Sequence, residues 1–248
     1  MTLFLIILIA SLVGSVVAML GGILLLINEA LAKRLSIYLL SFAAGSLMAA
    51  AIFELLPESL AGNVSESAIF IAFVTGIILF YILEKLLNFY HCHDQEKCDI
   101  HDFSLTVIIG DALHNFLDGI AIALSFLISI PTGIATTVAV FFHEVPQEIS
   151  DFGILLHNGY PRWKILKYNL AAALMTPAGA ILGYIFRSAL EPYIPIVLSI
   201  TAGSFIYISI SDLIPELRHK TGVREFAHIL IMILGIFSIW LIGTLLPE

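Results

Sequence analysis

Charged side chains are scarce in this sequence of 248 residues. Only 12% of the residues are Asp, Glu, Lys or Arg, and 60% are hydrophobic, whereas a soluble domain carries about 25% charged residues. Several apolar runs exceed the roughly 18 residues that indicate a membrane-spanning helix. Lipid cannot satisfy backbone polar groups, so spans are helices or closed barrels, and these runs are too long and too apolar for barrel strands. The sequence therefore predicts an all-α integral membrane protein.

Other absences narrow the range of functions. The two cysteines, Cys92 and Cys98, lie in one polar loop, which argues against a disulfide framework. No G-x-x-x-x-G-K-[ST] motif is present, so an ATP-driven pump would need a separate motor protein. The net charge of −8 argues against a nucleic-acid partner. The first apolar run lacks a basic start and continues to about Ile27, so we expect a retained span and not a cleaved signal peptide.

Breaks in hydropathy divide the chain into eight predicted transmembrane helices within a single transport domain, residues 1–248. The predicted spans lie near 2–27, 36–57, 67–90, 103–128, 132–157, 163–188, 192–216 and 225–246. The most polar join is the loop 91–102, which carries histidine and cysteine. Its spacing matches no structural zinc finger, so a metal-receiving loop and an ordinary solvated loop are both open.

The basic residues predict the orientation, because Lys and Arg concentrate in cytoplasmic loops. An even number of spans places both termini on one side, and of the 11 basic residues all except Arg187 fall on the other side. We therefore expect both termini outside, or in the lumen of an organelle, and the loop 91–102 in the cytosol. The expected location is the plasma membrane or a bacterial inner membrane, with lipid as the surrounding partner.

Two stretches of the sequence resemble each other at an offset of 158 residues. AAGSLMAAAIFELLPE begins at Ala43, and TAGSFIYISISDLIPE begins at Thr201. Glu54 in the first stretch corresponds to Asp212 in the second. The stretches belong to the second and seventh predicted spans, which run in opposite directions. We therefore predict an inverted repeat that relates the first and last three helices, a feature of secondary transporters.

Polar residues interrupt the apolar fourth and fifth spans, in the segments DALHNFLDG and FFHEVPQEISDF. His114 and His143 each lie about 16 Å from the start of their span, near the middle of a hydrocarbon core about 30 Å thick. Helical spacing places Asp111, His114 and Asp118 on one face, and pairs His143 with Gln147. A stripe of carboxylates follows beside them, formed by Glu144, Glu148 and Asp151.

Such groups are costly at mid-membrane unless they are paired, hydrated or bound to metal. Imidazole, carboxylate and amide ligands together suit a borderline divalent cation such as Zn²⁺. Carboxylates and amides hold zinc less firmly than thiolates would, which suits a carrier that must release its cargo. Hydrogen bonding between helices is the alternative for any single residue, but it does not account for so many polar groups at matched depth.

Two acidic pairs lie toward the ends of spans. Glu54 and Glu58 lie toward the outer end of the second span, and Asp212 and Glu216 toward the cytosolic end of the seventh. A role in gating or in admitting the cation is one interpretation of these pairs. Solvation of a helix end is the other.

The segments HNFLDG and HEVPQEISDF resemble the paired motifs of the ZIP (Zrt/Irt-like protein) family of metal-ion transporters. The resemblance is closest to the branch with the HExPHExGD motif in the fifth helix. It covers the whole chain, including eight spans and a His-bearing loop between the third and fourth. The resemblance implies a transporter of divalent metal ions, zinc preferred, that works toward the cytosol as one helical bundle moves against another, usually in a homodimer.

The resemblance also implies a binuclear metal site between the fourth and fifth spans. By motif position the ligands are His114, Asp118, His143 and Gln147 for the first metal, and Asn115 and Glu144 for the second, with Asp118 bridging. Glu54 stands where some relatives supply a further ligand, often His. Two positions depart from the motif: Gln147 replaces a His, and Ser150 replaces a Gly. Because Gln binds zinc more weakly than imidazole, these departures bear on affinity and metal preference.

Three functions are compatible with these residues. The first is transport without ATP, with Zn²⁺ as transported substrate and no resident cofactor; Fe²⁺, Mn²⁺ and Cd²⁺ remain open as cargo. The second is an intramembrane zinc metallohydrolase, because HEVPQ is similar to HExxH, although Gln147 replaces the second His and Pro146 interrupts the helix. The third is a metal-gated receptor that binds without flux. We favour transport, and therefore expect that the protein is not an enzyme.

Overall fold

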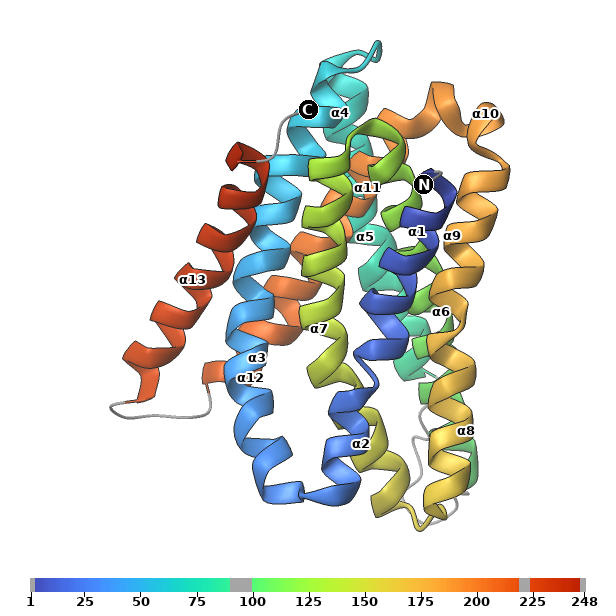
Figure 1. Ribbon diagram of the computed structural model, residues 1–248, viewed down its shortest axis with the longest axis vertical. Helices are drawn as coiled ribbons and strands as arrows, with labels where there is room; N and C mark the ends of the chain where they lie inside the picture. Colours follow the sequence, from blue (N-terminus) through green and yellow to red (C-terminus); the bar gives the residue numbers. More distant parts are fainter. Residues whose placement is uncertain (1–2, 90–99, 219–223, 246–248) are drawn as a thin grey trace.

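The computed structural model describes residues 3–89, 100–218 and 224–245, and all regular structure in these ranges is helical. In chain order the elements are α1 (Leu3–Leu12), η1 (Val13–Val17), α2 (Leu20–Ile27), α3 (Glu29–Ala49), η2 (Ala50–Leu55), α4 (Leu56–Ala61), α5 (Glu66–Phe89), α6 (Ile100–Ile128), α7 (Ile130–His157), α8 (Arg162–Ala173), α9 (Met175–Ile185), α10 (Arg187–Leu190), η3 (Glu191–Tyr193), α11 (Ile194–Tyr207), η4 (Ile208–Leu213), α12 (Ile214–Arg218) and α13 (Arg224–Leu245). They form one bundle, in which α1 begins and α13 ends at the same end, opposite the turn between α2 and α3 (Figure 1). The predicted all-α fold is confirmed. Most of the predicted loop 91–102 lies outside the described residues, and α6 begins within its last part.

Seven helical stretches are long and apolar enough to cross a membrane. They are Leu3–Ile27, Glu29–Ala61, Glu66–Leu83, Ile108–Ile128, Arg162–Ile185, Arg187–Leu213 and Phe226–Leu245. Each overlaps one predicted span, and the predicted span without a counterpart is 132–157. Its helix, α7, is 28 residues long but carries too many polar groups in its second half. The prediction of a multi-pass membrane protein is therefore confirmed. That the segment 132–157 also spans the membrane, which would bring the number of spans to eight, stays a prediction.

Capping side chains explain where two of the central helices begin. The hydroxyl of Ser129 accepts a hydrogen bond from the backbone N–H of Thr132 at 3.2 Å, and Pro131 occupies the first turn of α7, where its missing N–H costs nothing. The side chain of Asn28 likewise accepts from the N–H of Leu31 at 3.0 Å and caps α3. These tight turns make α6 and α7 antiparallel neighbours, as they do α2 and α3 (Figure 1).

The helix α7 packs against α2, α3 and α6, and α6 in turn packs most closely on α9. The contact between α6 and α9 depends on two glycines. A Cβ atom on Gly119 would overlap the carbonyl oxygen of Thr176, and one on Gly179 would overlap that of Phe116. Since only glycine permits this approach, the two backbones hold the polar part of α6 in a fixed position.

A short π-helical segment occurs twice at the offset of the predicted repeat. η2 joins α3 to α4, η4 joins α11 to α12, and their bounds differ by 158 residues at both ends. The helices α3 and α11 run in opposite directions along the bundle (Figure 1). This correspondence agrees with the predicted inverted repeat, which stays a prediction.

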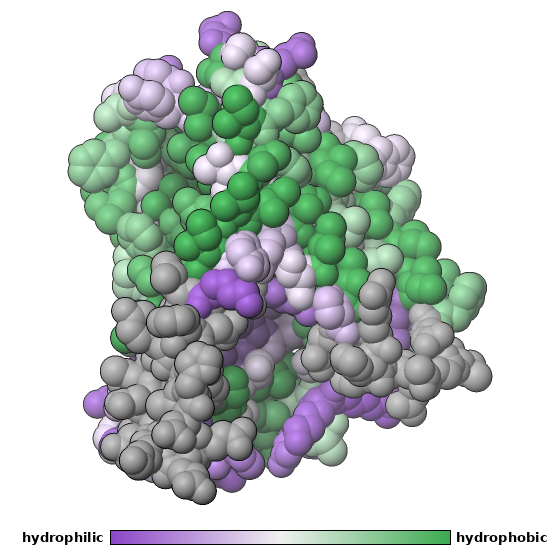
Figure 2. Space-filling view, turned by 180° about the vertical axis from the view of Figure 1, so that it is seen from behind, coloured by the Kyte–Doolittle hydropathy of each residue, from purple (hydrophilic) through white to green (hydrophobic). Residues whose placement is uncertain are grey.

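Much of the outer surface of the bundle is apolar. Large hydrophobic side chains on α5 and α13 are exposed, among them Ile71, Val74, Ile233 and Phe237. In Figure 2 apolar side chains cover the upper part of one face, and polar side chains gather in the lower part around a hollow. An apolar surface of this kind is what contact with lipid requires.

Candidate metal centre

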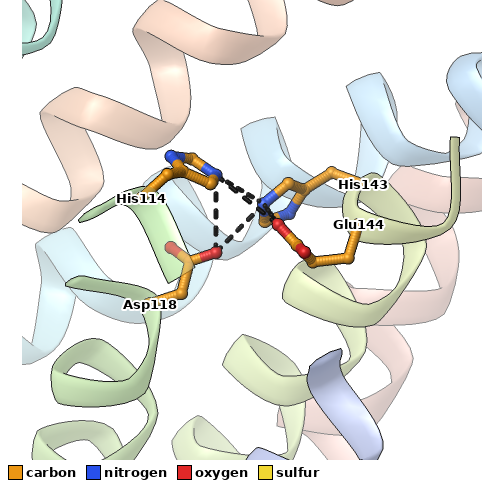
Figure 3. Close-up of side chains that lie close together, drawn as sticks. All are labelled: His114, Asp118, His143 and Glu144. Carbon is orange, nitrogen blue, oxygen red and sulfur yellow. Dashed lines mark hydrogen bonds and ion pairs between the residues drawn. The ribbon is translucent and has the colours of Figure 1, made fainter. Parts of the chain in front are cut away.

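Four metal-binding side chains meet where α6 passes α7. His114 and Asp118 come from α6, and His143 and Glu144 come from α7. One ligand atom from each lies within 4.8 Å of the others, and the side chains point toward one another (Figure 3). We refer to these four residues as the histidine cluster. The sequence predicts this meeting from the matched depth of the two histidines, and the structure confirms that they lie together.

The distances within the histidine cluster match those around a single zinc ion. His143 Nε2 lies 3.1 Å from His114 Nε2, 3.1 Å from Asp118 Oδ2 and 3.3 Å from Glu144 Oε1. His114 Nε2 lies 3.6 Å from Asp118 Oδ2 and 3.7 Å from Glu144 Oε1. Ligand atoms bound to a tetrahedral zinc at about 2.0–2.1 Å are about 3.3 Å apart. The donor set therefore fits one divalent cation.

The carboxylates of the histidine cluster are buried without good hydrogen bonds. Glu144 is 0% exposed and Asp118 is 3% exposed. Both carboxylate oxygens of Glu144 and Oδ2 of Asp118 have no hydrogen-bond partner among the described residues. Buried carboxylates of this kind are costly unless a cation neutralises them. The site therefore suits a positive charge, carried either by the imidazoles or by a cation bound between the four side chains.

The backbone of α7 orients one imidazole of the cluster. His143 Nδ1 lies 3.1 Å from the carbonyl oxygen of Ala139, one turn earlier in the helix. A proton on Nδ1 that is donated to this carbonyl leaves Nε2 free as a ligand, which is the usual arrangement around zinc-binding histidines. The side chain of His143 is 1% exposed, so its position is also fixed by packing.

Asn115 lies beside the histidine cluster, but its amide is fully engaged. Its Oδ1 accepts hydrogen bonds from the hydroxyls of Ser15 at 2.9 Å and Thr176 at 2.6 Å. Its Nδ2 donates to Oδ1 of Asp111 at 2.9 Å. The amide therefore ties α6 to η1 and to α9. The sequence did not predict the roles of Ser15 and Thr176, because single hydroxyls in apolar spans carry no periodic signal.

The other two predicted ligands lie outside the histidine cluster. Gln147 donates its Nε2 to Oδ1 of Asp111 at 2.9 Å, which turns its side chain toward that carboxylate. Glu54 lies against α13, where a Cβ on Gly243 would overlap its Oε1. It lines a separate cavity of about 460 Å³ together with Glu58 and Trp240. Of the seven predicted ligands, the structure thus brings four together and places two beside them.

A second cavity connects the histidine cluster to one end of the bundle. Its volume is about 530 Å³, and its lining includes His143, Gln147, Asp151, Asp212 and Lys33. Lys33 belongs to the first part of α3, at the end of the bundle opposite the start of α1 (Figure 1). We call this space the lower cavity. It gives the ligand atoms of His143 a route toward the end of the bundle opposite the start of α1.

Comparisons with known proteins agree on one family. A family model described as ZIP zinc transporter matches residues 89–243. Zinc transporter ZIP13 of Pongo abelii is 31% identical over 254 residues, which cover 92% of this chain and 76% of the relative. The zinc transporter ZIP13 homolog of Drosophila melanogaster is 28% identical and matches 96% of this chain and 89% of its own. Zinc transporter ZIP10 of Danio rerio is 37% identical over 151 residues, but the match covers 58% of this chain and only 18% of that longer relative.

Proposed function

This chain belongs to the ZIP family of zinc transporters, and on that basis we propose that it carries divalent metal ions, with zinc preferred, across a membrane. The observation that carries the proposal is the histidine cluster, in which four ligand atoms lie within 4.8 Å of one another between two central helices. Zinc or a related divalent ion is the transported substrate. The chain needs no further cofactor for this function.

The donor set explains how the site could both bind and release its cargo. Two neutral imidazoles and two carboxylates form a charge-compensated site for a dication. The buried carboxylates favour the cation strongly, because water is excluded from them. A shift of α6 relative to α7 would separate the ligands of the two helices, so neither helix alone retains the full set. Binding and release therefore depend on the relative position of the two helices.

The lower cavity supplies a route for the ion. It joins the histidine cluster to the end of the bundle opposite the start of α1. In the described part of the chain, every Lys and Arg except Arg187 lies on a helix near that end, which we assign to the cytosol by the positive-inside rule. Transport is then directed toward the cytosol, and the termini lie outside or in a lumen. The location is the plasma membrane or a bacterial inner membrane.

The finer features of the transporter are parts of the same proposal. The helix α7 is the fifth of eight spans, because its polar half faces other helices and not lipid. The inverted repeat relates the first and last three helices, and the chain works as a homodimer surrounded by lipid. Glu54 and Glu58 line the cavity at the outer end and meet the cation before the histidine cluster does. In a binuclear state Gln147 turns toward the first metal and Asn115 toward the second.

Neither alternative function gains support. The relatives are named as zinc transporters, whereas a metallohydrolase would need Glu144 as a general base beside the metal. Glu144 Oε1 instead lies among the ligand atoms of the histidine cluster. A receptor that binds metal without flux does not require the lower cavity.

The proposal is tested by zinc uptake into proteoliposomes that contain a fluorescent indicator. We expect His114→Ala and His143→Ala to lower the uptake rate at least about tenfold, because each removes a metal ligand. His157→Ala is the matched control, since this histidine is exposed near the end of α7. Zinc binding by the wild type without any uptake would leave a receptor as the better description.

A further inference from the structure

Three more carboxylates lie on α6 and α7 beyond the histidine cluster, toward the end of the bundle where the lower cavity lies. Asp111 precedes His114 by one turn of α6, and Glu148 and Asp151 follow Glu144 by one and two turns of α7. Because the two helices are antiparallel, both steps lead toward the same end of the bundle. Asp151 lines the lower cavity itself. The three carboxylates therefore follow the histidine cluster in the direction of the lower cavity, whose lining includes both His143 and Asp151.

These three side chains are buried, and two of them have unpartnered oxygens. Glu148 is 1% exposed, and neither of its carboxylate oxygens has a hydrogen-bond partner among the described residues. Oδ2 of Asp111 is likewise buried without a partner. Glu148 also faces the charges of Asp111, Glu144 and Asp151, all of the same sign. A group of buried carboxylates that repel one another is stable only with a positive charge among them.

No side chain in the described part of the protein supplies that charge. The ion pairs found there join the two histidines to Asp118 and Glu144, and Lys33 to Glu29. None of them includes the three carboxylates. Lys33 lines the lower cavity with Asp151, but its ammonium group is paired with Glu29 at the exposed start of α3. These carboxylates are therefore neutralised either by protons or by a bound cation.

Two amides hold Asp111 in a position suited to a ligand. Asn115 Nδ2 and Gln147 Nε2 both donate to Oδ1 of Asp111, each at 2.9 Å. Both donors serve the same oxygen, so Oδ2 stays free. A carboxylate oriented in this way on one oxygen, and free on the other, resembles the supported ligands of metal sites.

We propose that Asp111, Glu148 and Asp151 form a second cation station, which receives the divalent ion from the histidine cluster and passes it to the lower cavity. The inference rests on the proposed transport function. The station offers oxygen ligands only, so it is a harder and weaker site for zinc than the imidazole-containing cluster. It also accepts Mn²⁺ more readily relative to Zn²⁺ than the cluster does. The decline in zinc affinity along the route favours release toward the cavity.

The test measures how many ions the purified full chain binds in lipid nanodiscs, by equilibrium dialysis with Zn²⁺ and separately with Mn²⁺. We expect the wild type to bind one weakly held ion at this station in addition to what the histidine cluster binds tightly. Glu148→Gln should weaken the second site at least about tenfold and leave the tight site intact. His143→Ala should do the reverse. Glu66→Gln, an exposed acid at the start of α5, is the matched control and should change neither site.

Glu148→Gln keeps the shape of the side chain and removes repulsion, so the variant should fold, which its thermal unfolding will show. Asp151→Asn is the second variant, because its side chain lies at the cavity wall. If both variants fold and keep the weak site at its wild-type affinity, the proposed second station is wrong. Uptake measured on the same variants separates this outcome from the transport proposal. If His143→Ala loses uptake while Glu148→Gln and Asp151→Asn keep wild-type uptake and ion binding, the second cation station is contradicted and the transport proposal is still supported.

Discussion

At the scale of single residues, Asn115 has two possible roles: it positions the metal site, or it binds the metal directly. It accepts hydrogen bonds from Ser15 and Thr176 and donates one to Asp111. Asn115→Ala leaves the hydroxyl of Thr176 without its acceptor, so the free energy of unfolding should fall by about 1–3 kcal/mol. Thermal unfolding of the apo protein in detergent measures this change. The matched variant Asn169→Ala removes another buried amide, which bonds only within its own helix.

The two roles of Asn115 predict different binding results. A positioning residue destabilises the apo protein when it is removed, and zinc affinity falls only as the site loosens. A direct ligand in the binuclear site that the family resemblance implies would give the opposite pattern. Unchanged apo stability with a large loss of zinc affinity would therefore identify Asn115 as a ligand.

Glu54 poses a similar question at the other end of the bundle. It lies beside Gly243 and Trp240 and apart from the histidine cluster. We expect Glu54→Gln to lower the rate of zinc uptake, because it removes a negative charge from the outer cavity, without changing the affinity of the histidine cluster. Uptake and equilibrium zinc binding of the same preparation check this. A drop in affinity equal to that of His143→Ala would place Glu54 among the ligands.

The sequence predicts the histidine cluster well and its surroundings poorly, for a physical reason. His114, Asp118 and His143 are recognisable because charged and imidazole groups are costly in lipid, and helical spacing then fixes which of them share a face. The orientation of Gln147 toward Asp111 depends on a side-chain rotation that spacing does not determine. Ser15 is an unremarkable hydroxyl in an apolar run, and its partner is 100 residues away in the chain.

At the scale of helices, the close contact of α6 with α9 positions the metal ligands on α6. Gly119 directly follows Asp118 and faces the backbone of Thr176. Gly119→Ala should push α6 away from α9 and destabilise the protein by about 1–3 kcal/mol. It should also weaken zinc binding, since His114 and Asp118 move with their helix. Thermal unfolding and zinc titration measure the two effects.

Gly153 provides the control for this contact. A Cβ atom there would meet only Leu25 Cδ2, at 3.7 Å. Gly153→Ala should therefore leave zinc binding unchanged and raise stability by about 0.5–1 kcal/mol, as expected inside a helix. Equal behaviour of the two alanine variants would show that close backbone approach does not position α6.

The sequence predicts the positions of the spans but not the π-helical segments within them. Hydropathy locates the spans, because burial in lipid needs only length and apolar composition. The local change to π-helical bonding in η2 and η4 depends on how each span packs against its neighbours. Only the offset of 158 residues, visible in both the sequence and the two segments, connects them. Since π-helical segments occur frequently at functional sites, the matched positions of η2 and η4 mark both segments as places to examine for function.

At the scale of the whole molecule, the direction of transport follows from which end of the bundle faces the cytosol. Ser150 is an exposed residue that lines the lower cavity. Thr244 is an exposed residue that lines the cavity of about 460 Å³ beside Glu54, which we call the outer cavity. In a chain whose native Cys92 and Cys98 are replaced by Ser, cysteine can be introduced at either place. A membrane-impermeant maleimide then reports the side on which each cavity opens.

We expect Thr244→Cys to react in intact cells and Ser150→Cys only after the membrane is opened, because positively charged loops remain in the cytosol. Zinc should slow the reaction of Ser150→Cys, since an ion that leaves the histidine cluster passes beside it. Reaction of Ser150→Cys in intact cells, with Thr244→Cys protected, would invert the topology and make the protein an exporter. Reaction of both from one side would contradict a bundle that spans the membrane with its two cavities at opposite ends.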